Sequence, residues 1–379
     1  MTPFVFEARL PRVVFGAGSL ARLGAEIEAM GARRALVLST PEQAASARRI
    51  AEMLGERAAG VFAGAVMHVP IESAREARAE AQRLGADCAV AIGGGSTTGL
   101  GKAIALTVDA GPPQGDGAPP WGADAQRRGG SMSSGLPILA IPTTYAGSEM
   151  TPIYGITERG EKKTGRDARV MPKTVIYDPE LTVTLPAGLS VTSGLNAIAH
   201  AAEGLYAHDG NPIVGLMAED GIRALARALP LIQRSPTDLE ARSDALYGAW
   251  LCGVVLGQVA MGLHHKLCHT LGGSFNLPHA ETHAVVLPHA LAYNAEAAPR
   301  AMAAIARALD DASGNAPAAV QRLAFTLGAP TSLKALGMPA QGLDRAADLA
   351  AKTPYPNPRA LERGALRALL QRAYDGAAP

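Results

Sequence analysis

Residues 88–105 read CAVAIGGGSTTGLGKAIA, and this stretch decides the fold. A short apolar run ends at Ile92, and an apolar helical pattern resumes at Lys102. Between them lie the small and hydroxyl residues Gly93, Gly94, Gly95, Ser96 and Thr97. Glycines let the backbone approach a phosphate closely, and the free N–H groups of a helix N-terminus then bind the anion. The stretch therefore predicts a strand, a phosphate-binding turn and a helix, in that order.

Around this stretch, short apolar runs alternate with amphipathic helical segments. Strands are predicted at 34–39, 60–66, 88–92, 136–141 and 175–179, and helices at 44–54 and 72–84. This alternation is typical of right-handed crossovers in a parallel, doubly wound sheet. After Pro186 only helical periodicity continues. We therefore expect an α/β N-terminal doubly wound parallel sheet domain over 1–182, binding a dinucleotide, and an all-helical C-terminal substrate domain over 183–379.

A second polar loop, IPTTYAGSE at 141–149, follows the predicted strand 136–141. Ligands collect where parallel strands end, so two such loops at one sheet edge favour a dinucleotide. The segment 108–134, rich in Gly, Pro, Asp and Ser, is expected to be an excursion on the surface. The residues assigned to cofactor binding are Ser39, Thr40, Gly93, Gly94, Gly95, Ser96, Thr97, Thr143, Thr144 and Ser148.

Composition excludes several classes of protein. The net charge is +1 and aromatic residues make up 4%, which argues against nucleic-acid binding. The three cysteines form no CxxC pair, so neither a disulfide framework nor a cysteine zinc site is expected. We expect the protein to reside in a reducing cytoplasm. The N-terminus has no signal-peptide pattern. The uncharged stretch 245–263 approaches the length of a membrane span, but its glycines favour a buried helix, and no membrane partner is expected.

Histidines are concentrated in the predicted helical half. Asn196 and His200 lie four residues apart on one helix face, and His265 and His269 repeat this spacing. Together with His279, the cluster has two interpretations. His200, His265 and His279 could ligate zinc or iron, or the cluster could form a metal-free pocket for an anionic substrate. The neutral amide of Asn196 supplies no charge to a cation, which favours the metal-free interpretation.

Taken together, five motifs resemble the iron-containing alcohol dehydrogenases: AIGGGSTTGLGKAIA, IPTTYAGSE, YDPELTVTLP, SGLNAIAHAAEGLYA and HKLCHTLGGSFNLPHAETHAVVLPH. The likeness runs from FGAGSL near the start to YPNPR near the end. It implies a dehydroquinate synthase-like fold, with NADH or NADPH in a cleft between the two domains. Within the family, the chain most resembles the members that reduce maleylacetate, a small dicarboxylate.

The resemblance also implies roles for individual residues. The family's metal ligands, an aspartate and three histidines, map onto Asn196, His200, His265 and His279, and a further histidine near the nicotinamide maps onto His269. Asn196 departs from the family's aspartate, so a metal is not expected to be required. Thr40 departs from the family's acidic residue after the first strand, so a strict preference for NADH over NADPH is not expected.

The expected reaction is hydride addition to the C=C bond of maleylacetate, giving an enolate and then 3-oxoadipate. His200 and His265, with Lys162 or Lys163, are expected to stabilise the enolate oxygen. His269 or His279 is expected to donate the proton. We assign substrate contacts to the remaining polar candidates, Asn196, Tyr145 and His264. A homodimer is expected.

Three alternatives compete with this interpretation. The first is a metal-dependent alcohol dehydrogenase acting on a small alcohol or aldehyde, since a metal lowers the pKa of an alcohol. The second is a sugar-phosphate synthase related to dehydroquinate synthase. The third is a nucleotide-binding protein without catalytic activity, which the intact histidine set disfavours.

Overall fold

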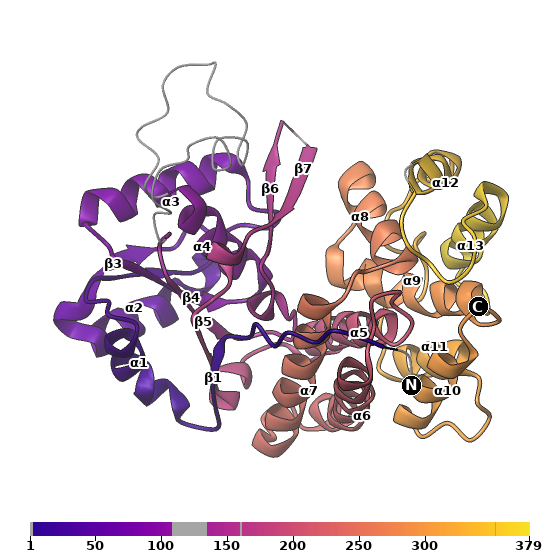
Figure 1. Ribbon diagram of the computed structural model, residues 1–379, viewed down its shortest axis with the longest axis horizontal. Coiled ribbons are helices and arrows are strands. Elements are labelled where there is room, and N and C mark those ends of the chain that lie inside the picture. The colour runs from indigo at the N-terminus through magenta and orange to yellow at the C-terminus, as the bar shows by residue number, and fades with distance from the viewer. Residues whose placement is uncertain (1–2, 108–134, 160, 353) are drawn as a thin grey trace. The chain divides into compact units, whose positions relative to one another are not determined.

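The computed structural model describes residues 3–107, 135–159, 161–352 and 354–379 and divides the chain into two compact units (Figure 1). The sheet unit comprises Pro11–Thr143 and Thr151–Asp178. The helical unit comprises Met1–Leu10, Thr144–Met150 and Pro179–Pro379. The functional domains expected at 1–182 and 183–379 stay a prediction, and the expected excursion at 108–134 lies outside the described residues.

The sheet unit is built on six parallel strands in the order β1-β8-β5-β4-β2-β3. Their bounds are β1 Arg12–Phe15, β2 Ala35–Leu38, β3 Ala58–Phe62, β4 Cys88–Gly93, β5 Ile138–Pro142 and β8 Thr174–Tyr177. The chain runs outward from β2 to β3 and then returns to place β4 on the other side of β2. This reversal is the switch point at which open parallel sheets bind ligands. The predicted doubly wound sheet is confirmed.

Helices cover both faces of this sheet, α1 and α2 on one face and α3 and α4 on the other (Figure 1). Their bounds are α1 Leu23–Ala29, α2 Ala44–Leu54, α3 Ile71–Leu84 and α4 Gly95–Thr107. Leu36 and Leu38 of β2 share a hydrophobic core with α3 and α4. Ala35 and Val37 are also fully buried, since alternate side chains of a strand point to opposite faces. A strand covered on both faces is apolar throughout, and this is why the sequence revealed it.

Two features of the sheet unit were not predicted. One is strand β1 at the sheet edge. The other is an antiparallel hairpin of β6 Ile153–Glu158 and β7 Glu161–Arg166. The strand predicted at 60–66 begins and ends earlier in the chain, because β3 spans Ala58–Phe62. The hairpin sequence carries several charges and, among its described residues, has only one buried hydrophobic residue, Ile156, so it lacks the alternation that signals a strand.

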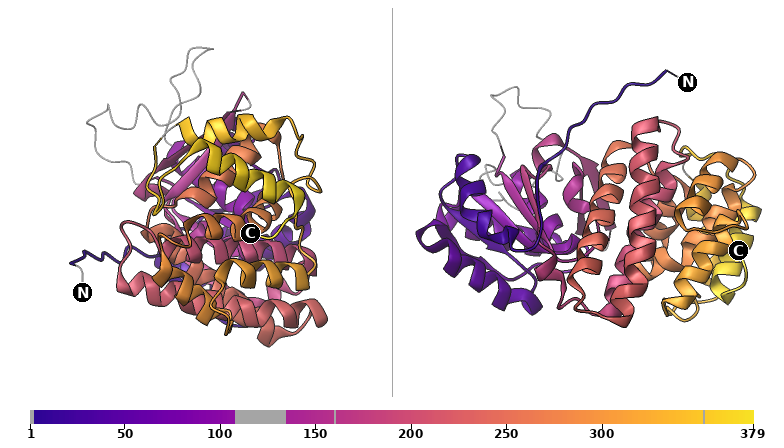
Figure 2. Two further views of the ribbon diagram at one scale, coloured as in Figure 1. Left: turned by 90° about the vertical axis from the view of Figure 1, so that its right-hand side faces the viewer. Right: turned by 90° about the horizontal axis from the view of Figure 1, so that it is seen from below.

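The helical unit follows β8, and the described residues contain no strand beyond Tyr177, as expected. Its central helix α5 packs against α6, α7 and α9. The last two helices, α12 and α13, lie side by side (yellow in Figure 2). The bounds are α5 Ala187–Gly204, α6 Pro212–Arg234, α7 Leu239–Gln258, α8 Leu263–Phe275, α9 His279–Asn294, α10 Pro299–Ala308, α11 Ala316–Thr326, α12 Gly342–Lys352 and α13 Arg363–Asp375.

The uncharged stretch 245–263 is not the single helix that the sequence predicted. Helix α7 ends at Gln258, Val259 is extended, and α8 begins after a bend of 94°. The carboxylate of Asp209 accepts the N–H of Ala260 at 3.0 Å and holds the chain in this break. Among the described residues no single helix has the length and hydropathy of a membrane span, although α7 and α8 taken together across their bend do.

Candidate functional site

The glycine turn and the threonine loop meet at one edge of the sheet. Strands β4 and β5 are paired so that Gly93 lies opposite Pro142, and the N–H of Thr143 donates to the carbonyl of Gly93 at 3.0 Å. Strand β2 pairs with the other side of β4, and therefore Ser39 follows at the same edge. The structure thus brings together loops that are far apart in the sequence, as expected.

Gly93 is required by its backbone conformation and by its neighbours. Its φ is +145°, which disfavours a side chain. A Cβ there would lie 2.5 Å from Thr97 Oγ1 and 2.7 Å from Gln43 Oε1. Gln43 was not predicted as a site residue, yet its Nε2 donates to Thr143 Oγ1 at 2.9 Å and joins the turn after β2 to the loop after β5. Its position just after the predicted strand 34–39 was the available signal.

This edge offers hydrogen-bonding groups to a ligand. Ser39 Oγ and Thr97 Oγ1 are buried and have no hydrogen-bond partner among the described residues. Helix α4 begins at Gly95, so its first N–H groups are free for an anion. Thr40 differs from Ser39, because its hydroxyl bonds the carboxyl of Glu42 and lowers the pKa of that carboxyl. An acid therefore lies beside Thr40, although not at the position where the family has one.

The loop Thr144–Met150 belongs to the helical unit. Tyr145 is fully buried there, and its hydroxyl accepts a hydrogen bond from Arg242 Nη1 at 3.2 Å. Its backbone N–H donates to Ser193 Oγ at 2.9 Å. The predicted substrate role of Tyr145 therefore stays a prediction, as do the cofactor roles of Thr144 and Ser148 in the same loop.

Two glycines bring this loop against the histidine-bearing helices. A Cβ on Gly147, whose φ is +76°, would lie 2.9 Å from the Cα of Gly253 in α7. The same Cβ would lie 3.6 Å from His200 Nδ1. The backbone of the loop therefore forms one wall beside His200, at a separation that side chains at 147 and 253 would prevent.

Six histidines from three helices form one cluster. Helix α5 carries His200; α8 carries His264, His265 and His269; and α9 carries His279 and His283. The ring of His265 is central, with its centroid 5.0 Å from those of His200 and His283 and 5.1 Å from that of His264. His279 lies 4.3 Å from His283 and stacks on His269 at 6.3 Å. The four histidines predicted as catalytic are thus close together, and His283 is a further member that the sequence analysis did not assign.

Glu203 is the third residue that sequence reasoning missed, after Gln43 and His283. It is fully buried on α5, three residues after His200, and its Oε2 lies 2.6 Å from His265 Nδ1. Burial alone would raise the pKa of this carboxyl, but the hydrogen bond and charge of His265 lower it to about 2. Glu203 therefore carries a negative charge inside the cluster. The spacing of three residues from His200 on one helix face was the signal for it.

Burial favours the neutral form of three rings in the cluster, His200, His264 and His283. Removal from water lowers the pKa values of His200 and His283 well below the usual 6.5, with neighbouring histidines adding to the shift. The same cause lowers the pKa of His264 to about 4. His264 Nε2 lies 3.2 Å from the carbonyl of His283, which can only accept, so Nε2 carries the proton and Nδ1 a lone pair.

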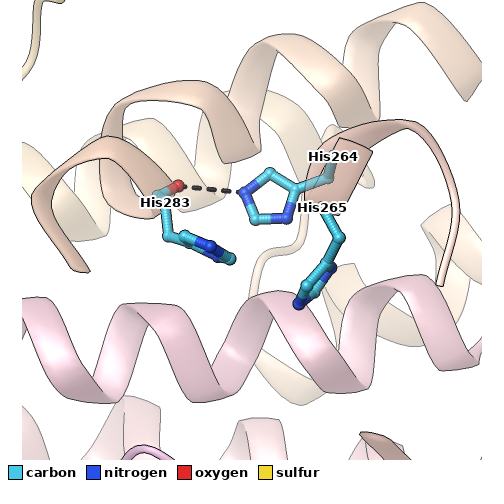
Figure 3. A group of neighbouring side chains, drawn as sticks. All are labelled: His264, His265 and His283. Carbon is cyan, nitrogen blue, oxygen red and sulfur yellow. Dashed lines mark hydrogen bonds between the residues drawn. The ribbon is translucent and has the colours of Figure 1, made fainter. Parts of the chain in front are cut away.

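Three of these rings could hold a metal ion. His264, His265 and His283 converge in Figure 3, with one ligand atom from each within 4.8 Å of the others. His200 Nδ1, His265 Nε2 and both nitrogens of His283 are buried without a hydrogen-bond partner among the described residues, as is Asn196 Oδ1. Unpaired buried nitrogens of this kind suit a ligand, and imidazole donors suit zinc, iron or copper.

The two candidate lysines belong to the β6–β7 hairpin of the sheet unit. Lys163 is largely exposed, and its Nζ pairs with Glu158 at 2.7 Å. Lys162 is paired in the hairpin through its backbone, and its side chain lies outside the described residues. Their predicted role at the enolate oxygen stays a prediction. All three cysteines are buried free thiols, as expected from their spacing.

Comparison with known proteins extends over the whole chain. The family model described as iron-containing alcohol dehydrogenase matches residues 11–179, and the model of the family's C-terminal part matches residues 190–374. The chain is 66% identical to a maleylacetate reductase of Burkholderia cepacia over 379 residues, all of both chains. It is 54% identical to one of Sphingobium indicum over 99% of each. The crystal structure of maleylacetate reductase from Agrobacterium tumefaciens superposes with a TM-score of 0.89 at 52% identity, covering both chains completely.

Proposed function

The chain belongs to the iron-containing alcohol dehydrogenase family, and we propose that it reduces the C=C bond of maleylacetate to 3-oxoadipate with NADH or NADPH. The observation that carries the substrate assignment is the 66% identity over the full length of a maleylacetate reductase. The expected cytoplasmic location and homodimer stay predictions.

In this proposal the sheet edge binds the cofactor. The free N–H groups at the start of α4 and the buried hydroxyls of Ser39 and Thr97 would hold its phosphates. Gln43 and Thr143 support the glycine turn from both sides. When bound, the cofactor would supply a hydride to the alkene carbon remote from the ketone. The electron pair of the C=C bond would then form a double bond to the ketone carbon, and the C=O pair would move onto the oxygen to give an enolate.

The histidine cluster would stabilise and protonate this enolate. His200 and His265 each have a buried ring nitrogen without a partner among the described residues, and either nitrogen, when it carries hydrogen, can donate to the enolate oxygen. His269 is exposed and His279 half-buried, so either can exchange protons with water and return one to the enolate carbon. One hydride and one proton are consumed for each C=C bond reduced.

The buried nitrogens also fit a divalent metal. His264, His265 and His283 would hold it, which is a different set from the one that the family resemblance implies, and as a Lewis acid it would polarise the ketone oxygen. We propose that the reduction does not require it, because conjugation already delivers charge to an oxygen that hydrogen bonds can stabilise. Asn196 also offers no charge to a cation.

The same triad favours one competing function, a metal-dependent alcohol dehydrogenase. A single assay separates the two. Reduced-nicotinamide absorbance is followed with maleylacetate, and separately with small aldehydes, after chelator treatment and after iron or zinc is restored. We expect maleylacetate turnover to survive chelation. Turnover only of aldehydes, and only with metal restored, would establish the alternative instead.

A further inference from the structure

Lys266 lies beside the histidine cluster and has no part in the chemistry proposed above. Within the described bounds of α5, α8 and α9, the helices that carry the six histidines, it is the only lysine or arginine. The proposed substrate has two carboxylates, whereas the histidines are assigned only to its ketone oxygen and to proton transfer. A carboxylate that leaves water needs a partner of opposite charge, and a lysine on these helices can supply it.

Lys266 flanks the open end of the cluster. It precedes His269 by three residues, so the two side chains are neighbours on the surface of α8. His269 is exposed and stacks on the half-buried His279, with ring centroids 6.3 Å apart. His264 and His265 are buried. Lys266 therefore belongs to the side of the cluster that solvent reaches, where a charged substrate can approach.

The ammonium group of Lys266 has no anionic partner among the described residues. Its Nζ lies 5.9 Å from the centre of the Tyr355 ring, whose face attracts a cation only weakly. The hydroxyl of Tyr355 is buried and also has no hydrogen-bond partner in the part of the chain that the structure describes. Burial raises the pKa of Tyr355, so the hydroxyl keeps its proton. Two neighbouring residues thus offer donors that no acceptor satisfies, and an anion would satisfy them.

We propose that Lys266 binds one carboxylate of the substrate and thereby makes this site selective for a dicarboxylate. The identity of the substrate rests on the proposed function, whereas the unpaired cation is a property of the helical unit alone. The ammonium donates to the carboxylate in a charge-assisted hydrogen bond. A small alcohol or aldehyde has no group for this cation, so Lys266 also distinguishes the proposed function from its alternative.

The first test replaces the charge and keeps most of the side-chain stem. In Lys266→Met, KM for maleylacetate should rise on the order of 10- to 100-fold, while the Kd for reduced nicotinamide stays within about twofold. Lys266→Arg keeps a positive charge and should recover part of the loss. The matched control is Lys334→Met, which removes an exposed lysine of the helical unit outside α5, α8 and α9. It should change neither quantity.

Esters of the substrate give a readout that a merely structural role would not move. Each of the two monomethyl esters of maleylacetate lacks one negative charge. With the wild-type protein, masking the carboxylate that Lys266 binds should raise KM by about tenfold or more. In Lys266→Met the same masking should add little, because the partner is already absent. A lysine that only packs against Tyr355 would instead leave the effect of each ester equal in both proteins.

Calorimetry with 3-oxoadipate, the expected product, separates this proposal from the proposed function. Binding should weaken by about tenfold or more in Lys266→Met and stay unchanged in Lys334→Met. Binding that depends on Lys266, together with no turnover of maleylacetate, would leave the carboxylate-binding role standing and refute the proposed function. Unchanged KM and Kd in Lys266→Met would overturn the role. It would also be overturned if neither ester differed from maleylacetate with the wild-type protein, a comparison that needs no variant to fold.

Discussion

The carboxyl ends of β2, β4 and β5 present mainly backbone groups and hydroxyls, whereas the interior formed by α5, α8 and α9 presents imidazole rings and one carboxylate. The first region needs no charged side chain, since helix N-termini and glycine turns bind anions by geometry. The second depends on which ring nitrogens carry protons, and buried neighbours control this. Substitutions at the strand ends should therefore alter cofactor affinity, and substitutions in the histidine cluster should alter turnover.

The largest effect should follow from His265→Ala. The loss of a group that stabilises or transfers charge in the transition state lowers turnover by about 10²- to 10⁴-fold. The Kd for reduced nicotinamide, measured by fluorescence titration, should remain within about twofold. A proportional loss of both quantities would mean that the two regions are not functionally distinct.

Gly93→Ala should produce the complementary effect. Its Cβ would meet Thr97 and Gln43 at less than 3 Å, in a backbone conformation that costs about 1–3 kcal/mol for a side chain. We expect cofactor Kd to rise on the order of 10-fold or more, with kcat at saturating cofactor less affected. Gly215→Ala in α6, where a Cβ meets nothing within 4 Å, is the control and should bind cofactor normally.

Acid should destabilise the helical unit before the sheet unit. The pKa values of His264 and His289 are lowered from 6.5 to about 4, mainly by burial. Their unfolded forms therefore take up protons below pH 6.5 while the folded forms do not. Stability should fall between pH 6.5 and 4, by about 1.4 kcal/mol per pH unit for each group.

Hydrogen exchange as a function of pH would locate this loss, with protection expected to decline first in α8 and α9. His289→Gln should flatten the pH dependence of unfolding. Equal acid sensitivity in the strands of the sheet unit would contradict the assignment, because that unit contains only His68 among the nine histidines.

The smallest effect is expected from Tyr145→Phe. Removing the hydroxyl that accepts from Arg242 leaves a buried donor short of one partner, which costs about 1 kcal/mol. Thermal unfolding should detect this loss, and KM for maleylacetate should remain unchanged. An increase in KM of tenfold or more would instead support the substrate contact predicted for Tyr145 from the sequence.

The sheet edge could be predicted from sequence because its parts are local. Apolar runs buried on both faces mark the strands, and the glycine and hydroxyl residues follow directly after them. Strand β1 escaped prediction because it lies at the sheet edge and only its Val14 is buried, whereas the equally short β2 and β8 are buried throughout. The β6–β7 hairpin escaped because it is largely polar. The end of α7 at Gln258 was missed because nothing in an uncharged run marks a break that a distant Asp209 stabilises.

The histidine cluster was predicted only in part. Spacing placed pairs such as His265 and His269 on one helix face, and the family resemblance linked them to His200 and His279. Neither the spacing nor the resemblance revealed that Glu203 and His283 both contact His265, because these contacts join three helices. A buried acid and a surface acid look alike in a helical sequence until the partner helix is placed.

The close approach of Gly147 and Gly253 has a consequence for dividing the chain. Residues 144–150 pack against α5 and α7 and belong to the helical unit, although the residues before and after them in the chain belong to the sheet unit. A fragment starting at Pro179 would lack Tyr145 and leave the Arg242 guanidinium short of one partner. The two halves matched by separate family models are therefore not independent modules, and a fragment of the helical half should express poorly unless residues 144–150 are supplied as a separate peptide.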